Sequence, residues 1–171
     1  MIRLARPDDL PELAEVESAA GLLFRDIGMD VVADDAPPTV AELIPYAADG
    51  RAWVFTGPGD RPVAYLLVDV VDGHAHLEQV SVRPEYARRG IGRRLVEVVR
   101  EWARAHGFAE LSLTTYAEVP WNGPYYARLG FEVVADEELT EGLRAIRATE
   151  AAKGLDAWPR VVMRQRLGSG P

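Results

Sequence analysis

Two glycines one residue apart, at positions 90 and 92, lie among four arginines in the middle of the chain (Arg88, Arg89, Arg93 and Arg94). A glycine lets the backbone approach a ligand closely because no Cβ intervenes. Guanidinium groups bind phosphate oxygens through paired hydrogen bonds. These residue types at this spacing therefore indicate an anion-binding loop, and a pyrophosphate group is the ligand that the pattern favours.

The flanking residues predict that this loop joins a strand to a helix. A β-branched run from Val80 to Val82 ends at Pro84, and after the glycines apolar residues recur at helical spacing (Leu95, Val98, Val99 and Trp102). The first turn of a helix has N–H groups without intrahelical acceptors and a partial positive charge, and both favour an anion. The alternative interpretation is an ordinary helix start with solvated arginines.

The loop is a basic island in an acidic protein. The stretch from Arg83 to Arg104 contains seven arginines and three glutamates, whereas the chain of 171 residues has a net charge of −8. This distribution favours a localised anionic ligand over nucleic acid bound along a whole face. Two familiar phosphate motifs do not fit, because Lys153 is the only lysine and Leu95 stands where the dinucleotide fingerprint requires a third glycine.

Two stretches resemble the signatures of the GNAT N-acetyltransferase superfamily. Val80-x-Val82-x-Pro84 followed by Arg88-Arg89-Gly90-Ile91-Gly92 is similar to the acetyl-CoA pyrophosphate loop of that family. The segment from Asn122 to Phe131 resembles its second signature, in which Asn opens a short helix and a Tyr precedes Gly-Phe. The match extends from about Leu77 to Val134, with one departure: Ala87 stands where the family usually has Gln or Arg.

The resemblance implies an α+β fold, with a central mixed, mostly antiparallel, splayed sheet flanked by helices on both faces of a single domain over residues 1–171. Local patterns predict strands at 2–5, 51–56, 62–71, 74–82, 111–115, 131–134 and 161–167. They predict a first helix that is capped by Asp8 or Asp9 and ends near Gly21, or near Gly28 after a break, and further helices at 39–48, 91–106, 121–129 and 140–153. Residues 28–38 are expected to form a loop or a disordered acidic linker, and residues 168–171 a frayed tail.

The resemblance also implies that acetyl-CoA is the cosubstrate. In the family geometry the strand of Val80 and Val82 splays away from a parallel neighbour, and the backbone of both valines binds the amides of pantetheine. The alternative for both valines is core packing. Asn122 is assigned to the cofactor by its matching position, with helix capping as an alternative. The pyrophosphate would bind the residues that match the loop signature (Arg88, Arg89, Gly90, Ile91, Gly92 and Arg93).

The implied reaction is direct transfer of an acetyl group to a primary amine, which must lose a proton before it attacks. Tyr126 matches the family's general-acid tyrosine, and a packing aromatic is its alternative role. Glu78 shares a strand face with Val80 and Val82 and is the candidate base or water-orienting group, unless it is only an exposed charge.

Aromatic and histidine side chains near these positions are less specific. Trp121 and Tyr116 are candidates to wall the acceptor pocket, although core or rim aromatics are equally expected. His74 and His76 flank a predicted turn and are expected at the surface.

Composition argues against several other chemistries. The chain has no cysteine and three histidines outside any metal-ligand spacing, so neither a disulfide nor a metal site is expected. No apolar run approaches the roughly 18 residues of a membrane span, and no signal peptide is recognisable. A cytoplasmic location without membrane or nucleic-acid partners is therefore expected, with a homodimer left open.

These observations favour an acetyl-CoA-dependent N-acetyltransferase of a small-molecule or peptide amine. The alternative is a non-catalytic acyl-CoA-binding or sensing module, and the retained Tyr126 favours the enzyme. The acidic balance outside the arginines mildly favours a cationic acceptor. The sequence identifies neither the amine nor the length of the acyl chain.

Overall fold

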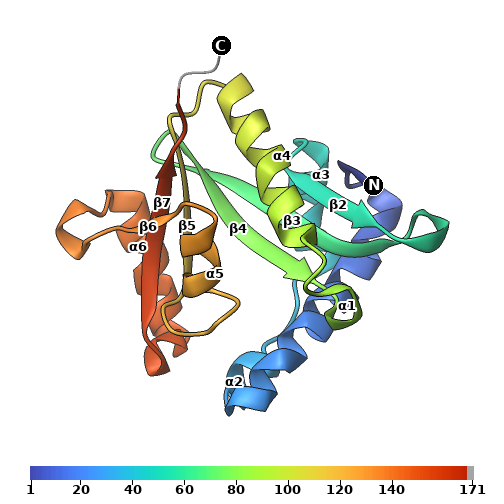
Figure 1. The fold of residues 1–171 in the computed structure, drawn as a ribbon, viewed down its shortest axis with the longest axis horizontal. Coiled ribbons are helices and arrows are strands. Elements are labelled where there is room, and N and C mark those ends of the chain that lie inside the picture. The colour runs from blue at the N-terminus through green and yellow to red at the C-terminus, as the bar shows by residue number, and fades with distance from the viewer. Residues whose placement is uncertain (169–171) are drawn as a thin grey trace. The chain divides into compact units, whose positions relative to one another are not determined.

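The computed structural model describes residues 1–168, which form a seven-stranded sheet in the order β1-β2-β3-β4-β5-β7-β6 (Figure 1). The pairs β1–β2, β2–β3, β5–β7 and β6–β7 are antiparallel, whereas β4–β5 is parallel. The predicted mixed, mostly antiparallel sheet is therefore confirmed. The strands are β1 (Ile2–Leu4), β2 (Ala52–Thr56), β3 (Pro62–Val71), β4 (His74–Val82), β5 (Glu110–Tyr116), β6 (Glu132–Val133) and β7 (Arg160–Arg166).

The helices in this part of the chain are α1 (Leu10–Gly21), α2 (Asp30–Ala33), α3 (Val40–Ala48), α4 (Ile91–Ala105), α5 (Gly123–Arg128) and α6 (Glu141–Ala152). The predicted ends of α4 and α6 agree with the structure to within one residue. The prediction of a loop at 28–38 is wrong over α2, where Ala33 N–H donates to the Met29 carbonyl at 3.0 Å. Burial of Met29 and Ala33 stabilises this single helical turn, which is too short to show a period in the sequence.

Internal contacts divide the chain into two compact units. The N-terminal unit comprises Met1–Val68 and Gln79–Val98, and the C-terminal unit comprises Asp69–Glu78 and the chain from Val99 onward. β3, β4 and α4 each contribute residues to both units. The expectation of a single domain stays a prediction.

In the N-terminal unit, α1 and α3 share an apolar core with β2 and β3 (Ala5, Leu10, Leu13, Val16, Leu43, Ala52, Val54, Tyr65 and Leu67). Thr39 starts α3 with a capping box, because its hydroxyl accepts the N–H of Glu42 at 3.2 Å and the Glu42 carboxylate accepts the N–H of Thr39 at 3.1 Å. The end of β4 is tied to β3 by the N–H of Arg83, which donates to the Val63 carbonyl at 3.0 Å. This core therefore supports the strand that leads into the arginine-glycine loop.

In the C-terminal unit, α6 packs behind β7 in the view of Figure 1, through a cluster formed by Val134, Leu143 and Val162. The carboxylate of Asp72, in the turn between β3 and β4, accepts the N–H of Gly142 at 2.8 Å. A Cβ on Gly142 would lie 2.6 Å from a Val71 methyl group, so glycine permits this close approach. The start of α6 is thus fastened to the tip of the β3–β4 hairpin.

No helix in residues 1–168 is long and apolar enough to cross a bilayer. The predicted frayed tail at 168–171 falls, apart from its first residue, on positions 169–171, which lie outside the described residues.

Candidate active site

The predicted anion-binding loop lies between β4 and α4 in the N-terminal unit. After a 3-10 turn at Pro84–Tyr86, Arg88 and Gly90 adopt left-handed φ values of 61° and 74°. α4 begins at Ile91, and the N–H of Arg94 donates to the Gly90 carbonyl at 3.0 Å. Because the first turn of a helix leaves its N–H groups without intrahelical acceptors, residues 91–93 together with the left-handed residues before them form a backbone nest suited to an anion.

Gly90 has a backbone conformation that favours glycine, and the space beside it is open. Its φ of 74° lies in the left-handed region, where other residues are strained. A Cβ built on it would have no heavy atom within 4 Å, so the space beside the loop is open to a ligand. The position therefore combines a required backbone conformation with room for a bulky anion.

The arginines around the loop have different roles. Nη2 of Arg89 donates to the Glu85 carbonyl at 3.0 Å, and its guanidinium lies 5.1 Å from the centroid of the Tyr86 ring. Arg94 lies 5.0 Å from the centroid of Phe55. The side chains of Arg88 and Arg93 are exposed, and Arg88 directly follows Ala87, where the family residue is missing.

β4 is paired with β5 over a short ladder. Ala75, His76 and Leu77 lie opposite Leu111, Ser112 and Leu113, and all six residues belong to the C-terminal unit. Val80 and Val82 continue β4 and are half-buried. The predicted binding of pantetheine by the backbone of these two valines stays a prediction.

Tyr126 lies on α5, one residue after Tyr125. Its N–H donates to the Asn122 carbonyl at 2.9 Å, and its carbonyl accepts the N–H of Phe131 at 3.1 Å. The ring meets Phe131 edge-on with centroids 5.8 Å apart. Burial raises the pKa of the Tyr126 hydroxyl above its usual value of 10.0, with a smaller contribution from Tyr125. At neutral pH the hydroxyl therefore keeps its proton, as a general acid must.

Asn122 precedes α5, but its side chain does not cap the helix. Its Nδ2 donates instead to the carbonyl of Trp121 at 3.1 Å, so the capping alternative for its side chain is wrong. Trp121 is half-buried, whereas Tyr116 is only 5% exposed and has the guanidinium of Arg160 4.4 Å from its ring centroid. Of the two aromatics, Trp121 is the more accessible to a ligand.

Glu78 lies on β4 in the C-terminal unit, and its side chain is exposed. Surrounding protein atoms, followed by the negative charge of Asp69 and a hydrogen bond with it, raise the pKa of Glu78 to about 7. Solvent contact screens these effects in part, but each of them acts in the same direction. A carboxyl group that titrates near neutrality is suited to accept a proton at physiological pH.

The expectation that His76 lies at the surface is wrong. The side chain is 1% exposed, and its Nδ1 lies 2.8 Å from the hydroxyl oxygen of Ser112 on the neighbouring strand. Burial lowers the pKa of His76, so the ring is neutral near pH 7. His74, nearer the turn, is half-buried. The alternation of His76 and Glu78 along one strand is the sequence signal that places both on the same face.

The candidate residues fall in both units. Val80, Val82 and residues 88–93 belong to the N-terminal unit, whereas Glu78, Tyr116 and residues 121–126 belong to the C-terminal unit. That these residues form one active site stays a prediction.

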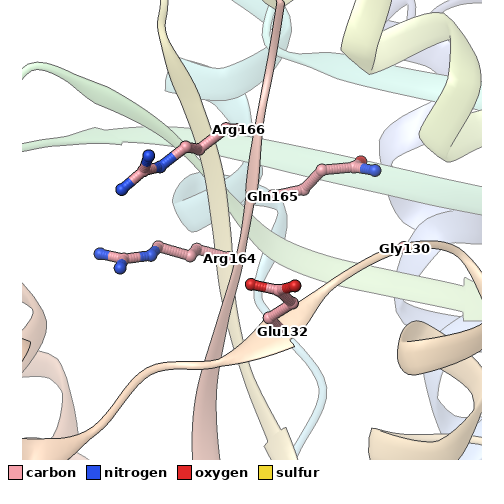
Figure 2. A pocket seen from close by; sticks show the side chains of 5 residues that line it. All are labelled: Gly130, Glu132, Arg164, Gln165 and Arg166. Carbon is pink, nitrogen blue, oxygen red and sulfur yellow. The ribbon is translucent and has the colours of Figure 1, made fainter.

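A pocket of about 490 Å³ opens beside β6 and β7 in the C-terminal unit, and Figure 2 shows the residues that line it (Gly130, Glu132, Arg164, Gln165 and Arg166). Arg164 and Arg166 point to one side of β7, and Gln165 points to the other. None of these five residues is a predicted catalytic or cofactor-binding residue. Within residues 1–168, no group of three His, Cys, Asp or Glu side chains is arranged to hold a metal ion.

Comparison with known proteins places these features in a family. The model of the acetyltransferase (GNAT) family matches residues 23–131. Mouse N-alpha-acetyltransferase 80 is 40% identical over 88 residues, which cover 44% of this chain and 24% of that protein. The chain thus matches about a quarter of the length of this relative.

Solved structures share the fold over almost the whole chain. The ribosomal-protein-S18-alanine N-acetyltransferase from Escherichia coli superposes with a TM-score of 0.68 at 20% identity, covering 100% of this chain and 96% of its own. The PaiA N-acetyltransferase from Thermoplasma acidophilum, in complex with coenzyme A, has a TM-score of 0.72 at 14% identity. The match covers 97% of this chain and 98% of that one. The family match spans well over half of the sequence and includes both the arginine-glycine loop and the segment from Asn122 to Phe131. The chain therefore belongs to the GNAT acetyltransferase family.

Proposed function

We propose that this protein is an acetyl-CoA-dependent N-acetyltransferase that transfers the acetyl group directly to a primary amine of a small molecule or peptide. The observation that carries the proposal is the backbone nest between β4 and α4, which lies inside the part of the chain that matches the family. The occurrence of coenzyme A in the Thermoplasma structure, which shares this fold, supports it.

The loop fits the diphosphate of coenzyme A in both shape and charge. Open space beside Gly90 accommodates the phosphates, and the N–H groups of Ile91, Gly92 and Arg93 supply donors. Exposed Arg88 provides a charged contact in place of the side chain that Ala87 lacks, because Arg89 is held by Glu85 and Tyr86. Val80, Val82 and Asn122 are the proposed contacts for the rest of the cofactor. When bound, acetyl-CoA supplies an acetyl group activated as a thioester.

Proton transfers are assigned to two side chains of the C-terminal unit. Glu78 accepts a proton from the acceptor amine, since its pKa of about 7 makes it a base at neutral pH that can still hold the proton. The hydroxyl of Tyr126 keeps its own proton and donates it to the departing sulfur atom. Trp121 is proposed to wall the acceptor pocket, with Tyr116 buried behind it as support.

The names of the relatives guide the choice of acceptor. Mouse N-alpha-acetyltransferase 80 and the ribosomal-protein-S18-alanine N-acetyltransferase are named for acetylation of protein α-amines or of a protein's alanine. Short peptides with a free α-amine are therefore proposed as the first acceptors to test, beside lysine-containing peptides and small diamines.

The proposal is tested by measuring thiol release from acetyl-CoA against this panel of amines. Turnover above the rate of hydrolysis with at least one amine, together with an acetylated product in the mass spectrum, is expected. Saturable binding of acetyl-CoA without turnover of any amine would contradict the proposal and favour an acyl-CoA-binding module.

Replacement of Tyr126 by Phe tests the proposed general acid. Loss of the hydroxyl is expected to lower kcat on the order of 100-fold, because general acids contribute at least this much, while the Kd for acetyl-CoA stays unchanged. Tyr125→Phe is the matched control, since it removes a hydroxyl from the adjacent position of the same helix. Equal kcat values for Tyr126→Phe and the wild type would remove the assignment.

A further inference from the structure

Two carboxyl groups of the C-terminal unit hydrogen-bond to each other on the β3–β4 hairpin: those of Asp69 and Glu78. The turn between the strands consists of Asp72 and Gly73, with φ values of 51° and 76°. A two-residue turn of this kind places Asp69 across from His76, and Glu78 is then its diagonal neighbour on the same face. The pairing is therefore built into the register of the hairpin.

This hydrogen bond requires a proton between the two side chains. An ionised carboxylate has only acceptors, so two carboxylates cannot hydrogen-bond to each other, and one partner must be protonated. Two carboxyl groups held close together favour the state in which one proton is shared, because the second negative charge is costly. A pair joined by this hydrogen bond thus carries one negative charge.

Titratable groups on β4 and near α6 surround the Asp69–Glu78 pair. His76 on β4 is neutral and lies against Ser112 of β5. Glu150 on α6 and Lys153, which directly follows α6, act on Glu78 with opposite charges. The Glu150 carboxylate is itself held by three donors, the hydroxyl of Thr114 at 2.6 Å and the guanidinium groups of Arg147 at 2.8 Å and Arg160 at 2.9 Å.

We propose that Asp69 and Glu78 act together as the proton acceptor of the transferase, with Glu78 facing the amine and Asp69 as the positioning residue that shares its proton. This inference rests on the proposed function, in which Glu78 is the base. It adds Asp69, a carboxyl group on β3, to the proposed catalytic residues. Neither the loop between β4 and α4 nor the α5 segment indicates a role for this residue.

The protons balance over one reaction. The acceptor arrives as an ammonium ion and gives one proton to the doubly ionised pair, which becomes singly protonated and hydrogen-bonded. The nitrogen then forms its bond to the acetyl carbon, and the carbon–sulfur bond breaks. Tyr126 gives its proton to sulfur, and the second proton that the nitrogen loses restores the Tyr126 hydroxyl. The pair returns its proton to solvent. The net products are an amide, a thiol and one proton.

Carboxyl titration followed by ¹³C NMR in the ligand-free protein tests the pair directly. In the wild type, one Glu resonance that Glu78→Gln removes is expected to titrate near pH 7. In Asp69→Asn the same resonance is expected to titrate about one pH unit lower or more, since the like charge is gone and an amide can donate to the carboxylate. Asp136→Asn, on an exposed turn of the same unit, is the matched control and is expected to leave the midpoint unchanged.

The acid limb of kcat/KM against pH then tests the catalytic role. Asp69→Asn is expected to move this limb to lower pH by the same amount as the NMR midpoint, and Glu78→Gln to abolish it. If the NMR midpoint of Glu78 does not move in Asp69→Asn, the two carboxyl groups do not share a proton. If the midpoint moves but the acid limb of kcat/KM does not, the pair is not the proton acceptor of the reaction. Should Asp69→Asn not fold, a Glu78→Gln/Glu17→Gln protein that retains a carboxyl titrating near pH 7 overturns the proposal equally, since Glu17 is the other carboxyl expected to titrate there. Absence of turnover with every amine overturns the proposed function instead, and the NMR titration distinguishes this case because it needs no cofactor.

Discussion

At the scale of single residues, Glu17 on α1 shows how a buried charge is handled in the N-terminal unit. The Oε2 atom of its carboxyl is enclosed by protein without a hydrogen-bond partner. Burial, reinforced by the negative charges of Asp35 and Glu42, raises the pKa of Glu17 to about 7. The folded protein therefore holds this proton more tightly than the unfolded chain does.

This difference predicts how stability changes with pH. Between the ordinary value of 4.5 and about 7, the folded state keeps a proton that the unfolded chain has lost, so stability falls as pH rises through this window. Glu17→Gln cannot ionise and is expected to lose this pH dependence, so its gain in stability over the wild type grows from pH 5 to pH 8. Urea unfolding at both pH values measures the difference. Glu15→Gln, on the exposed face of the same helix, is the control, and parallel pH profiles for Glu17→Gln and the wild type would contradict the prediction.

Residues within a local signature could be predicted from the sequence, whereas residues that meet across strands could not. Tyr126 lies in the segment that resembles the second family signature, and its role as the general acid stays a prediction. The burial of His76 and the pairing of Asp69 with Glu78 depend on the register of the hairpin and on the strand that follows β4. Those contacts join residues far apart in sequence, and no short pattern contains both partners.

At the scale of elements, α5 is positioned by a close backbone approach at its first residue. Gly123 is buried, and a Cβ there would lie 2.6 Å from the carbonyl oxygen of Ala117. A backbone atom cannot move away as a flexible side chain can. The direction in which α5 leaves β5, and therefore the position of Tyr126, depends on glycine at this site.

Replacement of Gly123 by Ala is expected to destabilise the protein by about 1–3 kcal/mol, the usual cost of overpacking, and to lower kcat because Tyr126 shifts with its helix. Gly21→Ala at the end of α1 is the matched control. Gly21 has helical φ and ψ values of −62° and −25°, and a Cβ there would meet only the Ala33 carbonyl at an ordinary 3.6 Å. The control is expected to gain about 0.4–1 kcal/mol. Urea denaturation measures both changes, and equal stabilities of the two variants would refute this account of α5.

Element length decided how well the fold could be predicted. α4 has an apolar period over 15 residues, and the hairpin of β3 and β4 has a clear turn signal, so both were predicted with nearly correct ends. α2 spans four residues, too few for any period, and it depends on the burial of Met29 and Ala33 in the tertiary structure. The tertiary environment, and not local preference, makes that turn helical.

At the scale of the whole molecule, the basic island is partly structural. Arg83 pairs with Glu15, Arg104 pairs with Glu101, and Arg100 donates to the side chain of Gln165 and to the Leu129 carbonyl. These arginines satisfy acceptors within their own units. The guanidinium groups of Arg88 and Arg93 are exposed, so they can supply charge to a bound anion in a protein whose net charge is −8.

Binding of coenzyme A to this nest should stabilise the folded protein by mass action. At a concentration 100 times the Kd, the expected gain is about 2.7 kcal/mol, which corresponds to a rise in Tm of roughly 5–10 °C for a chain of this size. Pantetheine lacks the diphosphate and cannot use the N–H groups of residues 91–93, so at equal concentration it should produce a much smaller shift. Differential scanning calorimetry with the two ligands makes the comparison. An unchanged Tm at saturating coenzyme A, or equal shifts with both ligands, would mean that the loop between β4 and α4 does not bind the diphosphate.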